Sequence, residues 1–299
     1  MPNVPPVMAE TTTHVPVLVD ETLRALAPAP GKTFLDGTAG HGGHAAALLA
    51  ATAPDGRLLG IDRDPRNLAV ATERLKPFGA RAVLARGSYE DMRDIAASAG
   101  VGPFDGVLLD VGFSSAHVDD PDRGFSFQSD GPLDMRYDPD HEETAAMIVN
   151  GWTKDELARL FRVYGEEPQA ARIAAALVEA RRRERFTRTG QLAEAIAAVL
   201  PRRGRTHPAT RAFQALRIAV NDELGALERA LPEALSVLKP GGRLVVISFH
   251  SLEDRIVKRF LAEREDVRAL TKRPVTATPA EIARNPRARS AKLRAAQLL

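Results

Sequence analysis

The sequence predicts an α/β fold, with a largely parallel sheet covered by helices on both faces and interrupted by an inserted all-α domain. Short apolar runs that end in small or acidic residues alternate with helical patterns through the first third of the chain. Such alternation indicates βαβ units. From residue 121 to residue 219 only helical patterns follow, and a strand-like run then resumes at Arg243–Ser248. The sheet is therefore expected to be discontinuous in sequence.

Each expected element has its own signal in the apolar pattern. The strands are expected at Thr33–Asp36, Arg57–Asp62, Arg81–Ala85, Asp105–Val111 and Arg243–Ser248. The helices are expected at Ala45–Ala51, Pro65–Lys76, Tyr89–Ala99, Thr153–Tyr164, Gln169–Arg185, Thr189–Val199 and Thr210–Asn221, with Thr153 and Thr189 as N-caps. Leucines at steps of three and four predict one more helix, which Pro240-Gly241-Gly242 ends (Leu224, Leu227, Leu231, Leu235 and Leu238).

These patterns divide the chain into three parts. Residues 14–120 and 220–299 form the sheet domain, and residues 121–219 form the helical insertion. Residues 1–13, rich in Pro and Thr, are expected to be a disordered leader. Only the two termini are expected to be loosely ordered.

Composition excludes several classes of protein. The chain has 299 residues, 44% of them hydrophobic and 27% charged, as in ordinary globular proteins. It contains no apolar run near the ~20 residues that span a bilayer and no secretion signal, so a cytoplasmic protein without membrane contact is expected. The absence of cysteine excludes thiolate nucleophiles, Cys-ligated zinc and iron–sulfur centres.

Positive charge is concentrated in two segments, although the whole chain carries only +2. Residues 181–219 contain ten arginines and two acids, a net +8, and residues 284–299 carry +5 without an acid. Segregated positive charge on an otherwise acidic protein is typical of nucleic-acid binding. Solvated helix faces are the simpler alternative.

A glycine-rich turn follows the first strand and opens a helix, at Asp36–His44. Glycines allow the backbone to turn sharply and to approach a ligand closely. Asp62 ends the second strand twenty residues after Gly42, the spacing at which an acid binds the ribose of an adenosine ligand. The turn therefore predicts an adenosine-containing cofactor.

Two further strand ends carry unusual polar sequence, and the carboxyl ends of parallel strands meet at one edge of a sheet. Asp110 ends the fourth strand and Phe113 follows it, so that the acid could accept from an exocyclic amine and the ring could stack on a base. Ser248-Phe249-His250 ends the fifth strand, where His250 could be a base. Core packing of Phe113 and a loop hydrogen bond of His250 remain open as alternatives.

Charge distinguishes two candidate cofactors. Gly40-His41-Gly42-Gly43-His44-Ala45 also fits the pattern of nicotinamide dehydrogenases. Asp36, directly before these glycines, would repel a pyrophosphate. Acids at positions 36, 62 and 110 suit a cation, so S-adenosylmethionine is favoured. Asp119-Asp120 and Asp138–Asp140 are better explained as turns than as a metal site, and no metal is expected.

Ten motifs stand in order along nearly the whole chain: His14–Leu18, Asp36–His44, Ile61–Asp64, Leu108–Ser115, Arg123–Phe127, Asp130–Arg136, Tyr164–Glu167, His207–Gln214, Ser248–Arg255 and Asn285–Ser290. Together they resemble one family, the bacterial 16S rRNA cytosine-N4 methyltransferases of the RsmH/MraW type. The resemblance implies a class I (Rossmann-like) S-adenosylmethionine-dependent methyltransferase sheet with an inserted substrate-recognition domain. It also implies methyl transfer to the N4 amine of a cytidine near the decoding centre of 16S rRNA in the small ribosomal subunit.

The resemblance and the strand ends together give a set of expected site residues. Asp110 and His250 are the catalytic candidates. A homodimer is the expected assembly. The cofactor would contact Asp36, Gly40, Gly42, Gly43, His44, Asp62, Tyr89, Asp110 and His117, and the RNA would contact Phe113, Ser248, Phe249 and Arg211.

The chain departs from the family at Tyr89, where phenylalanine is usual, and at His117, where glutamine is frequent. Residues 267–284 are also short for the family. A dehydrogenase and a non-catalytic RNA-binding module remain as alternatives from other classes. A DNA amino-methyltransferase is disfavoured because the chain lacks an Asp-Pro-Pro-Tyr run.

Overall fold

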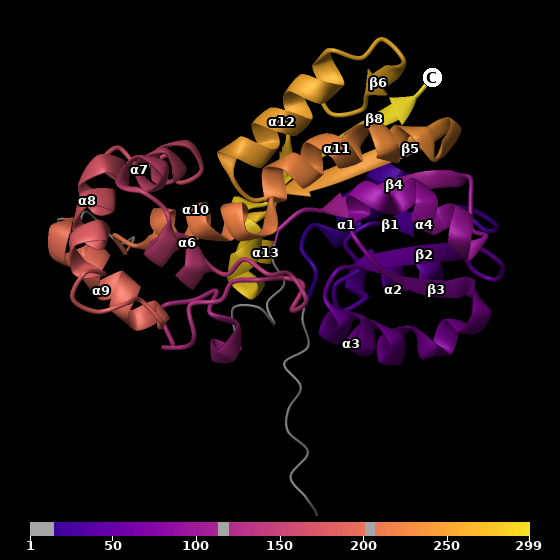
Figure 1. Ribbon diagram of the computed structural model, residues 1–299. Coiled ribbons are helices and arrows are strands. Elements are labelled where there is room, and N and C mark those ends of the chain that lie inside the picture. The colour runs from indigo at the N-terminus through magenta and orange to yellow at the C-terminus, as the bar shows by residue number, and fades with distance from the viewer. Residues whose placement is uncertain (1–14, 113–119, 201–206) are drawn as a thin grey trace, which may run out of the picture.

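The computed structural model describes residues 15–112, 120–200 and 207–299. One mixed sheet dominates the right half of Figure 1, with strand order β3-β2-β1-β4-β5-β8-β6 and with β7 beside β8. The strands from β3 to β5 in this order are parallel, and β8 is antiparallel to both β5 and β6. Their bounds are β1 Thr33–Asp36, β2 Arg57–Asp62, β3 Ala82–Arg86, β4 Phe104–Asp110, β5 Leu238–Ser248, β6 Val267–Ala269, β7 Val275–Thr276 and β8 Lys292–Leu298. This is the predicted methyltransferase sheet.

Neighbouring residues of the central strands enter two different cores, because side chains alternate across a sheet. Phe34 and Leu108 pack with one group of helices, whereas Leu35 and Leu109 pack with the other. The first group is α1 (Val19–Leu26), α2 (Gly43–Ala51) and α3 (Pro65–Leu75). The second is α4 (Met92–Ala99), α11 (Glu223–Ser236) and α12 (Ser251–Ala262). Helices therefore cover both faces, as the alternating pattern predicts.

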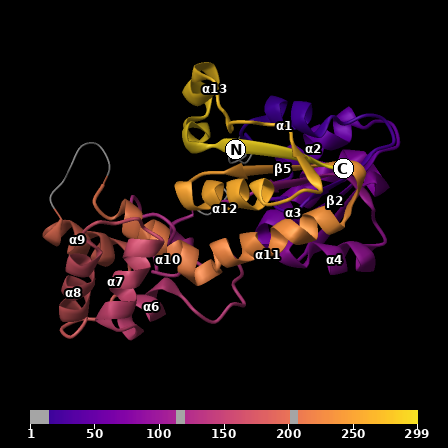
Figure 2. The ribbon, with the colours of Figure 1, turned by 90° about the horizontal axis from the view of Figure 1, so that it is seen from above.

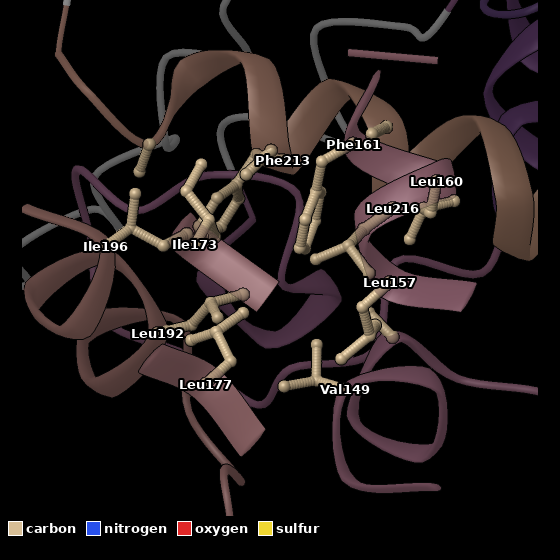
Figure 3. Packing of buried hydrophobic residues seen from close by; sticks show 14 of the residues in the cluster. Val149, Leu157, Leu160, Phe161, Ile173, Leu177, Leu192, Ile196, Phe213 and Leu216 are labelled. Carbon is tan, nitrogen blue, oxygen red and sulfur yellow. The ribbon is translucent and has the colours of Figure 1, made fainter. Parts of the chain in front are cut away.

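A third group of helices, away from both faces of the sheet, forms its own hydrophobic core to the left of the sheet in Figures 1 and 2. Figure 3 shows side chains such as Phe161, Ile173 and Phe213 pointing toward one another inside it. The helices are α6 (Ala145–Gly151), α7 (Lys154–Val163), α8 (Ala170–Ala180), α9 (Thr189–Val199) and α10 (Thr210–Asn221). In residues 120–200 and 207–219 the structure contains no strand, apart from one isolated bridge between Pro132 and Arg188.

Of the two N-caps predicted for these helices, one is confirmed and one is wrong. Thr153 caps α7 in a capping box: its backbone N–H donates to Glu156 Oε2 at 2.7 Å. Thr189 was predicted as an N-cap, and this is wrong, because it is the first residue of α9. Its buried hydroxyl accepts from the backbone N–H of Gly131 instead.

The helical insertion joins the sheet domain where α10 runs into α11. The residue between these helices, Asp222, is left-handed, with φ 47° and ψ 42°. Asp222 side-chain Oδ2 accepts from Arg229 at 2.6 Å. Figure 2 shows α10 and α11 following one another from the helical part to the sheet.

The C-terminal segment is ordered, contrary to the prediction from the sequence. It was expected to be loosely ordered, but Lys292–Leu298 forms β8 inside the sheet, with Leu293 and Ala296 buried. Arg294 forms an ion pair with Asp254 on α12 at 2.7 Å. The proposed leader, residues 1–13, lies outside the described residues. No helix in the part of the chain that the structure describes is long and apolar enough to cross a membrane.

Candidate active site

A cavity opens at the carboxyl ends of the parallel strands, where ligands bind in open α/β sheets. Its walls come from the loops after β1, β2, β3, β4 and β5, from the start of α11, and from residues of the chain termini. Residues far apart in the chain therefore face one space. They include Thr38, Gly40, Gly43, His44, Asp62, Tyr89, Asp110, Tyr137, Asn221, Glu223, Phe249, Glu253 and Arg287.

The glycine turn after β1 is held open by backbone geometry that favours glycine. Gly40 and Gly42 both have positive φ, 51° and 76°. The Gly40 N–H donates to Asp62 Oδ2 at 2.8 Å, so the loop is tied to the end of β2. Gly40 and Gly43 line the cavity, whereas Gly42 packs its backbone near Ala71 of α3.

Asp62 accepts hydrogen bonds from three residues, Gly40, Asp64 and Asn67. Besides Gly40 it accepts from the Asp64 backbone N–H at 2.8 Å, and Asn67 Nδ2 lies 3.3 Å from both of its oxygens. These bonds fix the orientation of the carboxylate at the cavity wall. A fixed carboxylate at this position could accept from ribose hydroxyls.

Asp36 and Asp110 end two adjacent parallel strands, and His44 lies beside them at the start of α2. Thr38 links the two strand ends, because its backbone N–H donates to Asp36 Oδ1 at 3.1 Å and its hydroxyl oxygen accepts from the Asp110 N–H at 2.7 Å. The His44 Nε2 atom lies 3.5 Å from Asp110 Oδ2. Asp36 is 1% exposed and lies behind the loop rather than on the cavity wall.

Burial and mutual charge determine the protonation of this cluster. Burial raises the pKa of Asp36 to about 6, although His44 and the Thr38 N–H act in the opposite direction. Burial lowers the pKa of His44, but the Asp110 and Asp36 carboxylates outweigh burial and leave that pKa above its ordinary value. Three atoms of the cluster have no hydrogen-bond partner in the part of the chain that the structure describes: Asp36 Oδ2, His44 Nε2 and Asp110 Oδ1.

Tyr89 borders the cavity after β3, with the Arg63 guanidinium 5.7 Å from its ring centroid. Burial raises the pKa of the Tyr89 hydroxyl, so the ring faces the cavity as a neutral group. A Cβ on Gly37 would lie 3.1 Å from Tyr89 Cβ and 2.6 Å from Leu109 Cδ2. A side chain at position 37 would therefore crowd Tyr89 and Leu109.

The residues that follow β5 lie in two places, on the cavity wall and at the N-terminal end of α12. Phe249 lines the cavity and packs against Gly112, where a Cβ would approach its ring to 2.9 Å. Ser248 is buried, and its hydroxyl lies 3.4 Å from the Lys292 carbonyl oxygen. His250 is the N-cap of α12 in a capping box with Glu253, and Glu253 rather than His250 lies on the cavity wall.

The remaining predicted residues lie elsewhere. Arg211 is on α10, where it donates to the Glu166 carbonyl oxygen at 3.0 Å, away from the cavity wall. Phe113 and His117 lie outside the described residues.

Sequence reasoning missed one wall of the cavity, formed by Tyr137, Asn221 and Glu223. The Tyr137 hydroxyl donates to Glu223 Oε1 at 2.8 Å, and the Tyr137 N–H donates to Asn221 Oδ1 at 2.7 Å. Arg217 makes two bonds to the Glu223 carboxylate, at 2.8 and 2.9 Å. The position of Tyr137 directly after the Asp130–Arg136 motif was the one available signal.

Glu223, His250 and Glu253 bring three possible metal-ligand atoms within 4.8 Å of one another. Their oxygens already have protein partners, since Glu223 binds Arg217 and Tyr137, and Glu253 Oε2 accepts from the Phe249 N–H at 2.8 Å. The two glutamates are therefore already engaged by protein groups in this structure.

The two basic segments are only partly available to a polyanion. Arg217 and Arg294 are in ion pairs with 9% and 11% side-chain exposure. Other arginines of these segments are exposed: Arg182, Arg183, Arg185, Arg188, Arg211, Arg284, Arg287 and Arg289.

Comparison with known proteins identifies the family. The pattern of the MraW methylase family matches residues 11–299. The ribosomal RNA small subunit methyltransferase H of Symbiobacterium thermophilum is 51% identical over 303 residues, which cover 94% of this chain and 95% of the relative. Two further proteins of the same name are similar to this chain. That of Thermomicrobium roseum is 49% identical, over 96% of this chain and 94% of the relative. That of Geobacter sulfurreducens is 51% identical, over 97% of this chain and 100% of the relative. The chain belongs to the MraW methylase family.

Proposed function

We propose that this protein transfers a methyl group from S-adenosylmethionine to the N4 amine of a cytidine in 16S rRNA of the small ribosomal subunit. The observation that carries the proposal is the position of Asp110. This carboxylate lies at the end of β4 on the cavity wall, and its Oδ1 has no hydrogen-bond partner among the described residues. Family membership and the names of the close relatives support the same reaction.

The residues present fit a cationic adenosine cofactor. Asp62 and Asp110 line the cavity together with Glu223 and Glu253, and a further carboxylate, Asp36, lies buried behind it. Partnerless oxygens on Asp36 and Asp110 are costly in a buried site unless a ligand compensates for their charge. Gly40, Gly43 and His44 would hold the methionine side, Asp62 the ribose and Tyr89 the adenine. When bound, S-adenosylmethionine supplies an electrophilic methyl group on a sulfonium.

The protein's own contribution is orientation and acceptance of a proton. The N4 lone pair of cytosine is conjugated with the ring, so the amine must be held in line with the methyl group. Such orientation is worth up to roughly 7–11 kcal/mol. The Asp110 carboxylate would accept a hydrogen bond from the amine and receive the proton that N4 loses. The Phe249 ring and the Val111 side chain would exclude water from this end of the cavity.

We place the RNA across the opening of the cavity, with the helical insertion (residues 121–219) as its recognition domain. The target base must leave its stack, at a cost of a few kcal/mol. The exposed arginines of the two basic segments would bind the backbone and offset that cost. Arg211 remains a candidate contact because its side chain is 53% exposed. Ser248 and His250 would act indirectly, through the β5–α12 loop that carries Phe249.

Binding of small-subunit rRNA is expected to weaken steeply with salt. About five phosphate contacts, each contributing roughly 0.7, predict a slope near −3.5 in a plot of log K against log salt concentration. Fluorescence anisotropy with a labelled fragment between low and moderate salt measures this slope. Binding that does not change with salt would contradict a role for the two basic segments.

The reaction itself is tested with purified protein, tritiated S-adenosylmethionine and small subunits from cells that lack the protein. Digestion and mass spectrometry should then find the label as N4-methylcytidine at one position. Label on another atom would contradict the proposal. Binding of NAD measured by calorimetry, without binding of S-adenosylhomocysteine, would favour a dehydrogenase.

The proposal places the enzyme in the cytoplasm, where its rRNA substrate is assembled, and includes a homodimer as its assembly. Sedimentation velocity of the purified protein, with and without rRNA, tests the assembly.

A further inference from the structure

Glu166 connects the helical insertion to the sheet domain, although it lies outside the cavity wall. It belongs to the turn between α7 and α8, and its side-chain partners belong to α12. The Ser251 hydroxyl donates to Glu166 Oε2, and the Arg255 guanidinium donates to Glu166 Oε1 at 3.2 Å. Both partners lie at the start of α12, directly after the loop that carries Phe249. One carboxylate therefore joins two parts of the chain that are more than eighty residues apart.

The backbone of this turn is held in a conformation that favours glycine. Glu166 has φ 46°, in the left-handed region that residues with a side chain rarely adopt. Its carbonyl oxygen accepts from Arg211 on α10 at 3.0 Å. The preceding Gly165 lies so close to α10 that a Cβ there would be 2.7 Å from the Arg211 carbonyl oxygen. Such strained residues persist only where their surroundings fix them, and they are frequent at functional sites.

The contact comes from the helical core of the insertion. Arg123 also binds the sheet domain, through Asp64 at 2.6 Å, but it lies on the segment that leads from the sheet into the insertion. Glu166 instead joins the helices themselves to the start of α12, next to the loop whose Phe249 lines the cavity. The helical core and this side of the cavity are therefore held in one relative position.

We propose that Glu166 is a positioning residue for methyl transfer: it docks the helical insertion on α12, so that an RNA bound by the insertion presents its target base to the cavity beside Phe249. The inference rests on the proposed function and adds a residue outside the cavity wall. The side chains of Glu166 and Arg255 are 43% and 48% exposed. Removing their contact therefore opens no hydrophobic core, and both domains stay folded in the variants that test it.

The first test removes the contact from the insertion side, with Glu166→Ala. At saturating small subunits we expect kcat to fall about 5- to 10-fold, because the bound RNA aligns its base with the methyl group less often. The Kd of S-adenosylhomocysteine, measured by calorimetry, should stay within about twofold of the wild type, since the cavity wall is intact. Glu179→Ala is the matched control and should keep wild-type kcat, because Glu179 binds Arg182, three residues further along, at 3.0 Å.

The second test removes the same contact from the sheet side, with the double variant Ser251→Ala/Arg255→Ala. It leaves the strained turn unchanged, so it gives an answer even if Glu166→Ala does not fold. We expect the same fall in kcat, and no further fall when all three substitutions are combined, because one contact is lost in each case. Charge alone would act in opposite directions on RNA binding, since Glu166→Ala removes an acid and the double variant removes a base.

A kcat of either variant within about twofold of the Glu179→Ala control would overturn the proposal, as would losses that multiply in the combined variant. The same series separates this inference from the proposed function. No N4-methylcytidine from the wild-type protein would refute the proposed function. Normal wild-type methylation with undiminished turnover in both variants would refute only the role of Glu166.

Discussion

Replacing Asp110 by asparagine is expected to lower kcat for methyl transfer by at least about 100-fold, with less than about a threefold change in the Kd of S-adenosylhomocysteine. The amide keeps the size of the side chain and the bond from the Asp110 N–H to Thr38. It removes the negative charge that would accept the proton of the amine. S-adenosylhomocysteine has no sulfonium, so its affinity should depend less on that charge than methyl transfer does. Single-turnover methylation of small subunits and calorimetry give the two quantities.

Asp105→Asn is the matched control, because Asp105 lies at the opposite end of the same strand, β4. Asp105 Oδ2 accepts from Lys239 at 2.7 Å and from the Thr33 N–H at 2.9 Å, away from the cavity wall. Its replacement should affect stability and leave kcat unchanged at a temperature where the variant is folded. Equal losses of turnover and of cofactor affinity in Asp110→Asn would show that Asp110 serves only the cofactor.

Arg217→Ala is expected to lower the free energy of unfolding by about 3–5 kcal/mol, because it leaves the Glu223 carboxylate buried without its counter-charge. The two side chains are 9% and 8% exposed and make two bonds. Burial lowers the pKa of Arg217, but the charge of Glu223 outweighs burial, and the pKa is raised. Urea unfolding followed by the fluorescence of Trp152, which packs against the helical core, measures the loss.

Arg182→Ala provides the comparison, since Arg182 forms an exposed pair with Glu179, with 72% and 60% side-chain exposure. Exposed pairs contribute only about 0–1 kcal/mol, so this variant should be close to the wild type. Replacing both Arg217 and Glu223 by apolar residues should recover part of the loss, because no buried charge then remains. A single Arg217→Ala variant as stable as Arg182→Ala would contradict the importance of this ion pair.

The sequence predicted the sheet and the convergence of its strand ends because both depend on local signals. Apolar runs ending in Asp36, Asp62 and Asp110 locate three strands, and parallel packing alone brings all three acids to one edge of the sheet. The roles of individual side chains in the β5–α12 loop could not be predicted from the sequence. A histidine before a helix can be a cap or a base, and only the contact of His250 with its own helix identifies it as a cap.

Other parts of the site could not be predicted because they depend on distant residues. Tyr137 and Glu223 are 86 residues apart, and their bond exists only because the helical insertion returns the chain to the sheet. The strand β8 was missed for a different reason. Its seven residues include three polar ones, Lys292, Arg294 and Gln297. Its buried residues, Leu293, Ala295 and Ala296, lie next to β5 in the sheet. Composition therefore indicated a basic tail, and only the pairing with β5, β6 and β7 identifies the strand.

The position of β8 has a consequence for how the protein is made. This last element of the chain lies between β5 and β6, and in the sheet β6 pairs only with β8. During translation β5 therefore emerges as an edge strand with open hydrogen-bonding groups, and it stays so until Lys292–Leu298 has left the ribosome. Folding of the nascent chain can proceed through the helical core and the first strands, but the sheet is completed only after β8 has emerged. A protein cut short before Lys292 would keep its cavity-lining loops after β1, β2 and β4 yet expose β5 to aggregation.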